Sequence, residues 1–239
     1  MIVFNTARPA VSDPAVRRAL AQAIDRRELV RRCFGGAHHP AGGGVIPPSV
    51  PGYSARIGVQ YDPEAARRSL KESEIERLNK APLRLLAPIK YKSVVEFVCE
   101  AWRSVLGIVP QVTLAPFEEI LEAAMKADHD AVLAGGTGPS HPEAYIRGVV
   151  LSRNRRTPDP LLASPEEIRW ANDAVELDER LDRFRELDRR VTQSAARVPL
   201  YYENSYTLVR PWVSSLRLQP FGHASFEDAR ILPHEADES

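Results

Sequence analysis

The chain has 239 residues, of which 44% are hydrophobic, and its 32 basic side chains are balanced by 32 acidic ones. This length and apolar content suffice for one or two compact cores, and the zero net charge argues against a general binder of nucleic acids or anionic membranes, which would carry a basic excess. No apolar run reaches the 18 residues that would indicate a transmembrane helix, so none is predicted.

The cysteines and histidines do not predict a metal or cofactor site. Cys33 and Cys99 lie far apart in the sequence and have no metal-ligating neighbours. A single disulfide between them is possible, but buried free thiols are the expected state. The histidines, including the pair at 38 and 39, lack the spacing of zinc ligands. We therefore expect no metal and no cofactor.

The first segment predicts a short strand followed by a helix. Residues 1–5 are apolar and alternate weakly, which suits a strand. Ser12 or Asp13 is a suitable N-cap, and Pro14 follows in the first turn. We expect one helix from there toward Cys33, ended by glycines 35 and 36. Its buried face is predicted to hold Val16, Ala19, Leu20, Ala23 and Ile24.

The polar face of this helix carries the arginine pairs Arg17–Arg18 and Arg26–Arg27, which we expect to be solvated charges and not a phosphate site. Residues 35–60 are rich in Gly and Pro and predict a long loop. Glycines 42–44 within it are not followed by Lys-Ser or Lys-Thr, so they predict a flexible turn and not a phosphate cradle. Asp62 and Pro63 then start a helix that runs to Leu70.

Residues 82–134 alternate between strand-like and helix-like patterns. The predicted strands are 82–89, 109–114 and 131–134, and the predicted helices are 92–106 and 116–126. Such alternation is typical of βαβ units with right-handed crossovers and a largely parallel sheet.

The last part of the chain predicts a long helix and a β-rich tail. Residues 164–194 read as one amphipathic helix, with a strong start signal in Ser-Pro-Glu-Glu and with Leu181, Phe184, Leu187 and Val191 on its apolar face. Residues 200–209 predict a strand, and residues 212–231 predict a hairpin-like tail. Residues after 233 are acidic and expected to be frayed.

Several of these motifs together resemble the family 5 extracellular solute-binding proteins, the receptors of ABC importers for peptides and nickel. Residues 13–26 read Asp-Pro-Ala-Val-Arg-Arg-Ala-Leu-Ala-Gln-Ala-Ile-Asp-Arg, and residues 61–70 read Tyr-Asp-Pro-Glu-Ala-Ala-Arg-Arg-Ser-Leu. Val-Pro-Leu-Tyr-Tyr at 198–202 and Val-Arg-Pro-Trp-Val at 209–213 are similar to the closing segment of oligopeptide receptors. The resemblance covers nearly all of this chain but only the C-terminal half of a family member.

The resemblance implies an α/β lobe of the periplasmic-binding-protein type II kind, with a mostly parallel central sheet flanked by helices and a C-terminal strand and hairpin segment. Residues 1–198 would form the second, C-terminal ligand-binding lobe. Residues 199–233 would be a return segment that packs on a first lobe missing here, and 234–239 a frayed tail. The uncovered face would permit self-association.

By the same resemblance, the function is noncatalytic capture of a small solute, expected to be a peptide, through closure of a two-lobed clamp. The partners would be this ligand and the permease of an ABC transporter, with no nucleic acid and no membrane insertion. No catalytic motif is present, so we do not expect an enzyme. Weak or no binding is expected of the isolated chain, which would supply about half of the contacts.

The family is periplasmic or extracellular, whereas the first residues show neither a basic n-region nor an apolar h-region. As written, the chain would stay in the cytoplasm. A cytoplasmic ligand-sensing lobe of a transcriptional regulator and a truncated, nonfunctional gene product are therefore the alternatives.

The first candidate ligand site is the loop that follows the predicted strand 131–134. Ligands of open α/β sheets bind beyond the carboxyl ends of strands, and glycines let backbone amides approach a ligand closely. In the family this loop carries Gly and Trp and then an Asp that pairs with the amino terminus of a bound peptide; here Gly136 takes the place of Trp, and Gly138 or Pro139 lies near the Asp position. Recognition of a free amine is thus in doubt, with Glu143 as the substitute acid. The candidates in this loop are Gly135, Gly136, Thr137, Gly138, His141 and Glu143.

Tyr201 and Tyr202 are the second candidate site. Their counterparts in the family lie near the hinge, and tyrosine offers a broad contact surface with a polar tip. Successive residues of a strand point to opposite faces, so at most one of the two is expected to face the ligand. The other is expected to belong to the core.

Overall fold

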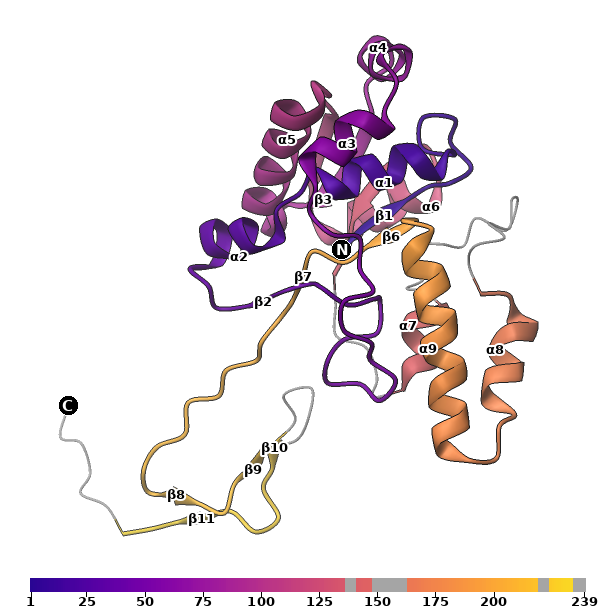
Figure 1. Cartoon of the computed structure of the whole chain (residues 1–239). Helices are drawn as coiled ribbons and strands as arrows, with labels where there is room; N and C mark the ends of the chain where they lie inside the picture. The colour runs from indigo at the N-terminus through magenta and orange to yellow at the C-terminus, as the bar shows by residue number, and fades with distance from the viewer. Residues whose placement is uncertain (136–140, 148–162, 219–223, 234–239) are drawn as a thin grey trace, which may run out of the picture. The chain divides into compact units, whose positions relative to one another are not determined.

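The computed structural model describes residues 1–135, 141–147, 163–218 and 224–233 (Figure 1). The chain divides into two compact units, Met1–Tyr202 and Glu203–Ser239. Within the described residues, no helix is both long and apolar enough to span a membrane.

A five-stranded sheet forms the centre of the first unit, in the order β4-β3-β5-β1-β6. Its strands are β1 (Ile2–Phe4), β3 (Arg84–Pro88), β4 (Gln111–Ala115), β5 (Ala131–Leu133) and β6 (Arg197–Val198). β3 pairs in parallel with β4 and β5, whereas β1 lies antiparallel between β5 and β6. Only β1 therefore opposes the common strand direction, and the predicted α/β unit with a mostly parallel sheet is confirmed.

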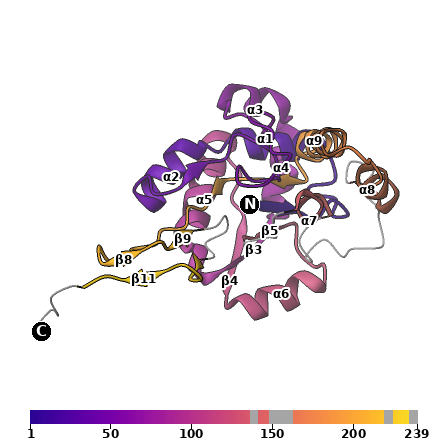
Figure 2. The same ribbon diagram turned by 90° about the horizontal axis from the view of Figure 1, so that it is seen from below.

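Helices cover both faces of this sheet. The larger core joins alternate strand residues, such as Leu85 and Leu133, to α1 (Pro14–Gln22), α2 (Arg26–Phe34), α3 (Pro63–Ser69) and α5 (Lys92–Leu106). On the other face, Leu86 and Val132 pack against Ile120 of α6 (Phe117–Met125). Figure 2 shows α6 on the side of the sheet opposite α1, α3 and α5. Because successive side chains of a strand point to opposite faces of the sheet, the strands contribute to two separate apolar layers.

The single helix predicted from Pro14 toward Cys33 is wrong, because α1 ends at Gln22 and α2 begins at Arg26. Asp25 causes the break: its carboxylate accepts hydrogen bonds from the amides of Arg27 (2.9 Å) and Glu28 (3.1 Å), which makes it the N-cap of a new helix. The predicted end is confirmed, since Gly35 adopts the left-handed conformation with φ 58°.

The prediction that all four arginines of this region are solvated is also wrong for two of them. Arg18 and Arg27 are exposed, but Arg17 and Arg26 are 1% and 7% exposed. Each buried guanidinium donates to backbone carbonyl oxygens, chiefly those of Ser194 for Arg17 and Pro199 for Arg26. These arginines therefore tie α1 and α2 to Ser194 and Pro199, which lie far away in the sequence.

Short elements lie within and after the long Gly/Pro-rich loop. β2 (His39–Pro40) pairs antiparallel with β7 (Tyr201–Tyr202), so the strand predicted at 200–209 is confined to two residues. α3 begins after the N-cap Asp62 as predicted. A further helix, α4 (Glu72–Lys80), was not predicted. The short 3-10 helix η1 (Ile89–Tyr91) links β3 to α5.

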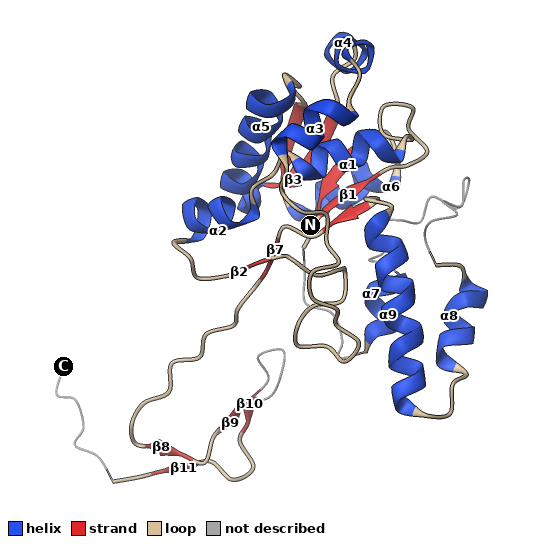
Figure 3. Cartoon of the chain, in the orientation of Figure 1, coloured by secondary structure: helices blue, strands red, loops and turns tan. Residues whose placement is uncertain are grey.

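Three further helices, α7 (Pro142–Arg147), α8 (Pro165–Asn172) and α9 (Leu177–Gln193), contact one another and form a group beside the sheet (Figure 3). The single helix predicted at 164–194 is wrong, because the chain leaves helical conformation between α8 and α9. The predicted start is confirmed as a capping box, in which Glu167 N donates to Ser164 Oγ (3.2 Å) and Ser164 N donates to Glu167 Oε2 (2.7 Å).

The second unit contains two short antiparallel ladders, as its hairpin-like sequence predicts. β8 (Val213–Ser214) pairs with β11 (Arg230–Ile231), and β9 (Arg217–Leu218) pairs with β10 (Ala224–Ser225). The tail 234–239, expected to be frayed, lies outside the described residues.

Candidate functional site

Three of the candidate residues, Gly135, Tyr201 and Tyr202, follow strands that end at one edge of the sheet. Because β3, β5 and β6 run in the same direction, their carboxyl ends lie at this edge, which we call the carboxyl edge. Tyr91 follows β3, Gly135 follows β5, and Tyr201 with Tyr202 follow β6. The fold thus brings the two predicted candidate sites, 66 residues apart at Gly135 and Tyr201 in sequence, to the side of the sheet where α/β proteins bind ligands.

Gly135 lies against the side chain of Tyr91. A Cβ atom added at Gly135 would overlap the Tyr91 hydroxyl group, so a larger residue here would displace Tyr91. Tyr91 is buried, and Lys90 Nζ lies 4.8 Å from the centre of its ring. The backbone that leaves β5 is therefore held at the carboxyl edge by a side chain from the neighbouring strand connection. Gly136, Thr137 and Gly138 lie outside the described residues.

His141 and Glu143 lie at the start of α7, where both contact protein groups. The His141 ring packs edge-on against Phe184 with centroids 5.9 Å apart, and its Nδ1 accepts a hydrogen bond from Glu143 N (3.3 Å). The Glu143 carboxylate forms an ion pair with Arg147 and accepts from Asn172 Nδ2 (2.8 Å). Glu143 therefore links α7 to α8, and its role as the partner of a ligand amine stays a prediction.

Tyr201 belongs to a cluster of three rings at the end of α2. Its ring centre lies 4.6 Å from that of Phe34 and 5.5 Å from that of His38, and the Phe34 and His38 centres are 4.6 Å apart. Tyr201 is half-buried and packs on the larger core. This cluster presents aromatic surface near the carboxyl end of β6.

Tyr202 contacts other residues than Tyr201 does, because successive side chains of a strand point to opposite faces. Its hydroxyl donates to the Gly44 carbonyl oxygen (2.8 Å), and its ring contacts Tyr53 edge-on with centroids 6.2 Å apart. Burial raises the pKa of Tyr202 well above its ordinary value, so it stays a neutral donor. Which of the two tyrosines faces a ligand stays a prediction.

The sequence analysis missed Asp188 of α9, although a signal was present. Asp188 lies one residue after Leu187 and four after Phe184, within the apolar stripe of the helix, and its residue is 0% exposed. Its Oδ1 accepts from Val45 N (2.8 Å). Glycines 43 and 44 are buried and closely packed, contrary to the flexible turn predicted for them: a Cβ at Gly44 would overlap the Asp188 carboxylate.

A narrow crevice, too tight to admit a water molecule, lies beside this contact. Arg26 and Arg197 contribute to its lining together with Gly43 and Thr192. Burial lowers the pKa of each guanidinium to about 10, so both remain charged at neutral pH. Arg26 Nε donates to the Pro199 carbonyl oxygen (2.9 Å), and Arg197 Nη1 to that of Tyr145 (3.1 Å). Both guanidinium groups thus donate hydrogen bonds to backbone carbonyl oxygens.

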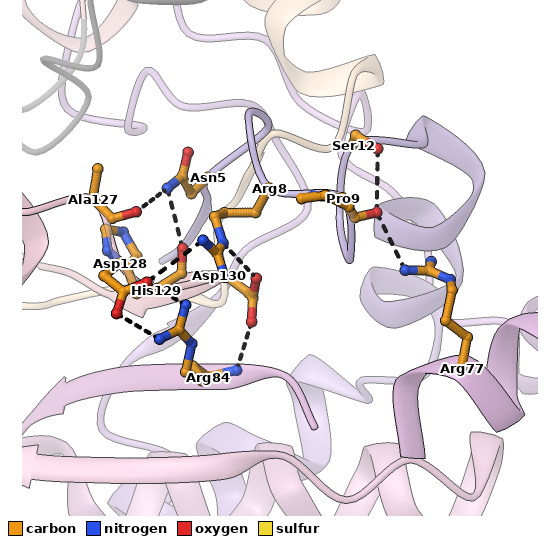
Figure 4. Close-up of polar contacts among 10 residues, drawn as sticks. All are labelled: Asn5, Arg8, Pro9, Ser12, Arg77, Arg84, Ala127, Asp128, His129 and Asp130. Carbon is orange, nitrogen blue, oxygen red and sulfur yellow. Dashed lines mark hydrogen bonds and ion pairs between the residues drawn. The ribbon is translucent and has the colours of Figure 1, made fainter. Parts of the chain in front are cut away.

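The opposite edge of the sheet carries a network of hydrogen bonds and ion pairs (Figure 4). Arg84 holds the Asp128 carboxylate with two hydrogen bonds (2.7 and 2.5 Å), while Asp130 accepts from Arg84 N (2.8 Å) and Arg8 Nε (3.3 Å). Asn5 Nδ2 donates to the carbonyl oxygens of Ala127 and His129, each at 3.1 Å. This network ties the start of β5 to β3 and to the end of β1.

The two cysteines and the possible metal ligands are the remaining chemistry-bearing groups of the described residues. Cys33 and Cys99 are free thiols, as expected, and burial raises the pKa of each. No group of three potential metal ligands occurs among the described residues.

Residues 1–156 match the model of the bacterial extracellular solute-binding proteins, family 5 Middle. The chain is 28% identical over 265 residues to the probable ABC transporter periplasmic-binding protein SapA of Escherichia coli K12, covering 99% of the chain and 45% of SapA. It is 25% identical to probable di/tripeptide-binding protein 5 of Pseudomonas aeruginosa UCBPP-PA14, over 96% of the chain and 45% of that protein. The chain thus spans about half the length of these relatives.

Solved structures show the same fold. HbpA2 from Haemophilus parasuis superposes with a TM-score of 0.76 at 15% identity, over 96% of this chain and 47% of HbpA2. The Escherichia coli murein tripeptide binding protein MppA superposes with a TM-score of 0.70 at 18% identity, over 98% and 48%. The predicted periplasmic-binding-protein type II lobe is thereby confirmed.

Proposed function

Because the chain belongs to the bacterial extracellular solute-binding proteins of family 5, we propose that it captures a small peptide, without catalysis, as one lobe of an ABC importer's receptor. The observation that carries this proposal is the pattern of coverage. Similarity to a periplasmic-binding protein of an ABC transporter extends over 99% of the chain and 45% of that relative. Two further relatives that match with comparable coverage are named for dipeptides or for di- and tripeptides.

In this proposal, residues 1–198 are the second lobe and residues 199–233 return to pack on a first lobe. Large apolar side chains of the second unit support such packing, because Leu208, Phe226 and Ile231 are 101%, 70% and 76% exposed. Apolar surface of this kind is stabilised by burial against a partner. The working location is outside the cytoplasm, and the further partner is the importer's permease.

The ligand would bind at the carboxyl edge, with contacts from both lobes when the clamp closes. We propose that the backbone of residues 135–138 approaches the peptide, flanked by His141 and Glu143 at the start of α7. Tyr201, half-buried within its aromatic cluster, would offer apolar contact, and the Tyr202 hydroxyl would support the adjoining loop. No covalent step is involved, and selectivity would come from the fit of the closed form.

A titration of the ¹⁵N-labelled chain with di- and trialanine, followed by amide NMR shifts, tests this proposal. A complete site with micromolar affinity corresponds to about 8 kcal/mol, so a lobe that supplies half of it should bind with a Kd on the order of 1 mM. We expect localised shifts at Gly135, Tyr201 and Tyr202. Micromolar binding by the chain alone would contradict a half-site, and localised shifts elsewhere on the chain would contradict the assigned surface.

A matched pair of glycine variants sharpens the titration. Gly135→Ala places a methyl group on the Tyr91 hydroxyl, whereas Gly42→Ala adds one where no atom lies within 4 Å. Gly135→Ala should weaken peptide binding and Gly42→Ala should not. The amide spectrum of each variant reports whether it is folded. Equal affinities of the two folded variants would exclude the backbone at Gly135 from the site.

A further inference from the structure

One carboxylate in the core of the first unit is buried with few hydrogen-bond donors and without a positively charged partner among the described residues. Asp188 of α9 is 0% exposed. Oδ1 accepts from Val45 N (2.8 Å) and from Thr192 Oγ1 (3.3 Å). Oδ2 is buried and has no hydrogen-bond partner among the described residues. A carboxylate in this position loses its hydration without a full set of replacements, which is costly when it is charged.

Asp188 contacts the backbone of Gly44 and Val45. Gly44 lies so close that a Cβ atom there would overlap the carboxylate, and the next residue supplies the amide that Oδ1 accepts from. On its other side, the Gly44 carbonyl oxygen accepts from the Tyr202 hydroxyl (2.8 Å). Loop 41–46 is therefore held between α9 and β7, with Gly44 as the shared contact. Movement of this loop away from Asp188 would break the support of Tyr202.

The charged and titratable groups around Asp188 do not compensate its charge. Tyr202 from β7 is a neutral phenol, because burial raises its pKa, and Tyr53 from the loop supplies no positive charge. Arg26 from α2 and Arg197 from β6 line the adjoining crevice, but their guanidiniums donate to backbone carbonyls. No ion pair to Asp188 occurs among the described residues.

The protonation state follows from this environment. Burial raises the pKa of Asp188 from 3.8 to about 6, against the opposing hydrogen bonds from the Val45 amide and Thr192. Below about pH 6 the neutral acid is thus favoured in the closed structure. The ionised form is favoured when the loop moves away and admits water.

We propose that Asp188 is a protonation-dependent latch that holds loop 41–46 and thereby positions the Tyr202 hydroxyl at the carboxyl edge. With Asp188 neutral, the loop stays closed on α9. Ionisation favours opening, because the open loop lets water solvate the carboxylate. An effect of the latch on peptide capture rests on the proposed function, but the latch itself is a property of the ligand-free chain.

Hydrogen exchange of the Val45 and Ile46 amides, measured by NMR on the ligand-free chain, tests the latch. With a pKa of about 6 in the closed state and 3.8 in the open one, the opening equilibrium constant should rise about tenfold between pH 5 and pH 7.5, after correction for intrinsic exchange. The Val45 amide shift should titrate with a midpoint near 6. A midpoint near 4, or pH-independent protection, would overturn the proposal.

Two variants assign the effect to Asp188. Asp188→Asn keeps an oxygen for the Val45 amide but cannot ionise, so protection at Val45 should no longer depend on pH. Gly44→Ala forces a methyl group against the carboxylate and should loosen the loop at every pH, while Gly42→Ala, with open space around it, should behave as wild type. A pH dependence that persists unchanged in Asp188→Asn would overturn the latch. Because no peptide is present, these outcomes are independent of the proposed function.

Discussion

Replacement of Arg17 by Met should destabilise the first unit severely, although Arg17 lies in a sequence that reads as a polar helix face. The guanidinium is 1% exposed and donates from Nε (3.2 Å) and Nη2 (2.9 Å) to the Ser194 carbonyl oxygen. Its Nη1 donates to the carbonyl oxygens of Val11 (2.9 Å) and Ser12 (2.7 Å). Methionine fills part of the volume but leaves all three carbonyls without this donor.

The expected loss can be worked out from these contacts. A buried polar group left without its partner costs about 1–3 kcal/mol, and water will reach some of the carbonyls, so we expect a loss of about 3–5 kcal/mol in the free energy of unfolding. With a urea m-value of about 2–3 kcal/mol/M for a chain of this size, the midpoint should fall by roughly 1–2 M. The loss of stability in Arg17→Lys should be smaller than in Arg17→Met, but an ammonium group cannot reproduce the hydrogen bonds of the planar guanidinium to all three carbonyl oxygens.

Urea unfolding followed by circular dichroism at 222 nm measures this loss, and Arg18→Met is the matched control. Arg18 is the exposed neighbour on the same helix, with one long hydrogen bond to Gln193 O (3.3 Å). Its removal should change stability by no more than about 0.5 kcal/mol. A loss below 1 kcal/mol for Arg17→Met at an unchanged m-value, or equal losses in the two variants, would refute the assignment of Arg17 as a structural clamp.

Three further outcomes follow from single contacts. Trp102→Phe removes the donor to the Leu20 carbonyl oxygen (2.9 Å) and leaves a void at a 0% exposed site, so thermal and urea unfolding should show a loss of about 2–3 kcal/mol; no change would mean that the carbonyl finds water. Ser164→Ala removes the side-chain half of the capping box with Glu167 and should cost about 1 kcal/mol, which a Ser164→Asp variant should restore. Burial lowers the pKa of His129, so its contribution to stability is present above the ordinary pKa of 6.5 and is lost as the pH falls. His129→Leu should therefore weaken the loss of stability measured between pH 7 and pH 5, and an identical pH slope in both proteins would contradict the sign.

Local signals in the sequence predicted most of the elements. Gly107 ends α5 where the pattern places it, in the left-handed conformation with φ 69°, and Asp62 and Ser164 cap the helices expected after them. Asp25 was read as part of a continuous helix because its neighbours keep the apolar period, although it also has the chemistry of an N-cap. α4 was missed because it has no side-chain cap and little apolar surface.

Burial of charged residues was less predictable, because it depends on groups far away in the chain. Arg26 looks like a solvated charge until the carbonyl of Pro199 is brought beside it by the end of β6. The same holds for Gly135, whose need for glycine comes from the Tyr91 hydroxyl. Asp188 differs, since its place within an apolar stripe was visible from spacing alone. A lone carboxylate at a core position is a signal that deserves weight in such sequences.

The place of β1 between β5 and β6 has a consequence for how the chain folds. Ile2 pairs with Leu133 on one side and with Val198 on the other, so β1 waits for partners that lie far after it in the chain and leave the ribosome much later. Closing such long loops slows folding. Both edges of β1 are open to pairing with other chains until β5 has emerged, and one edge stays open until β6 has emerged. Delayed sheet completion therefore favours slow refolding in vitro and a dependence on chaperones during synthesis.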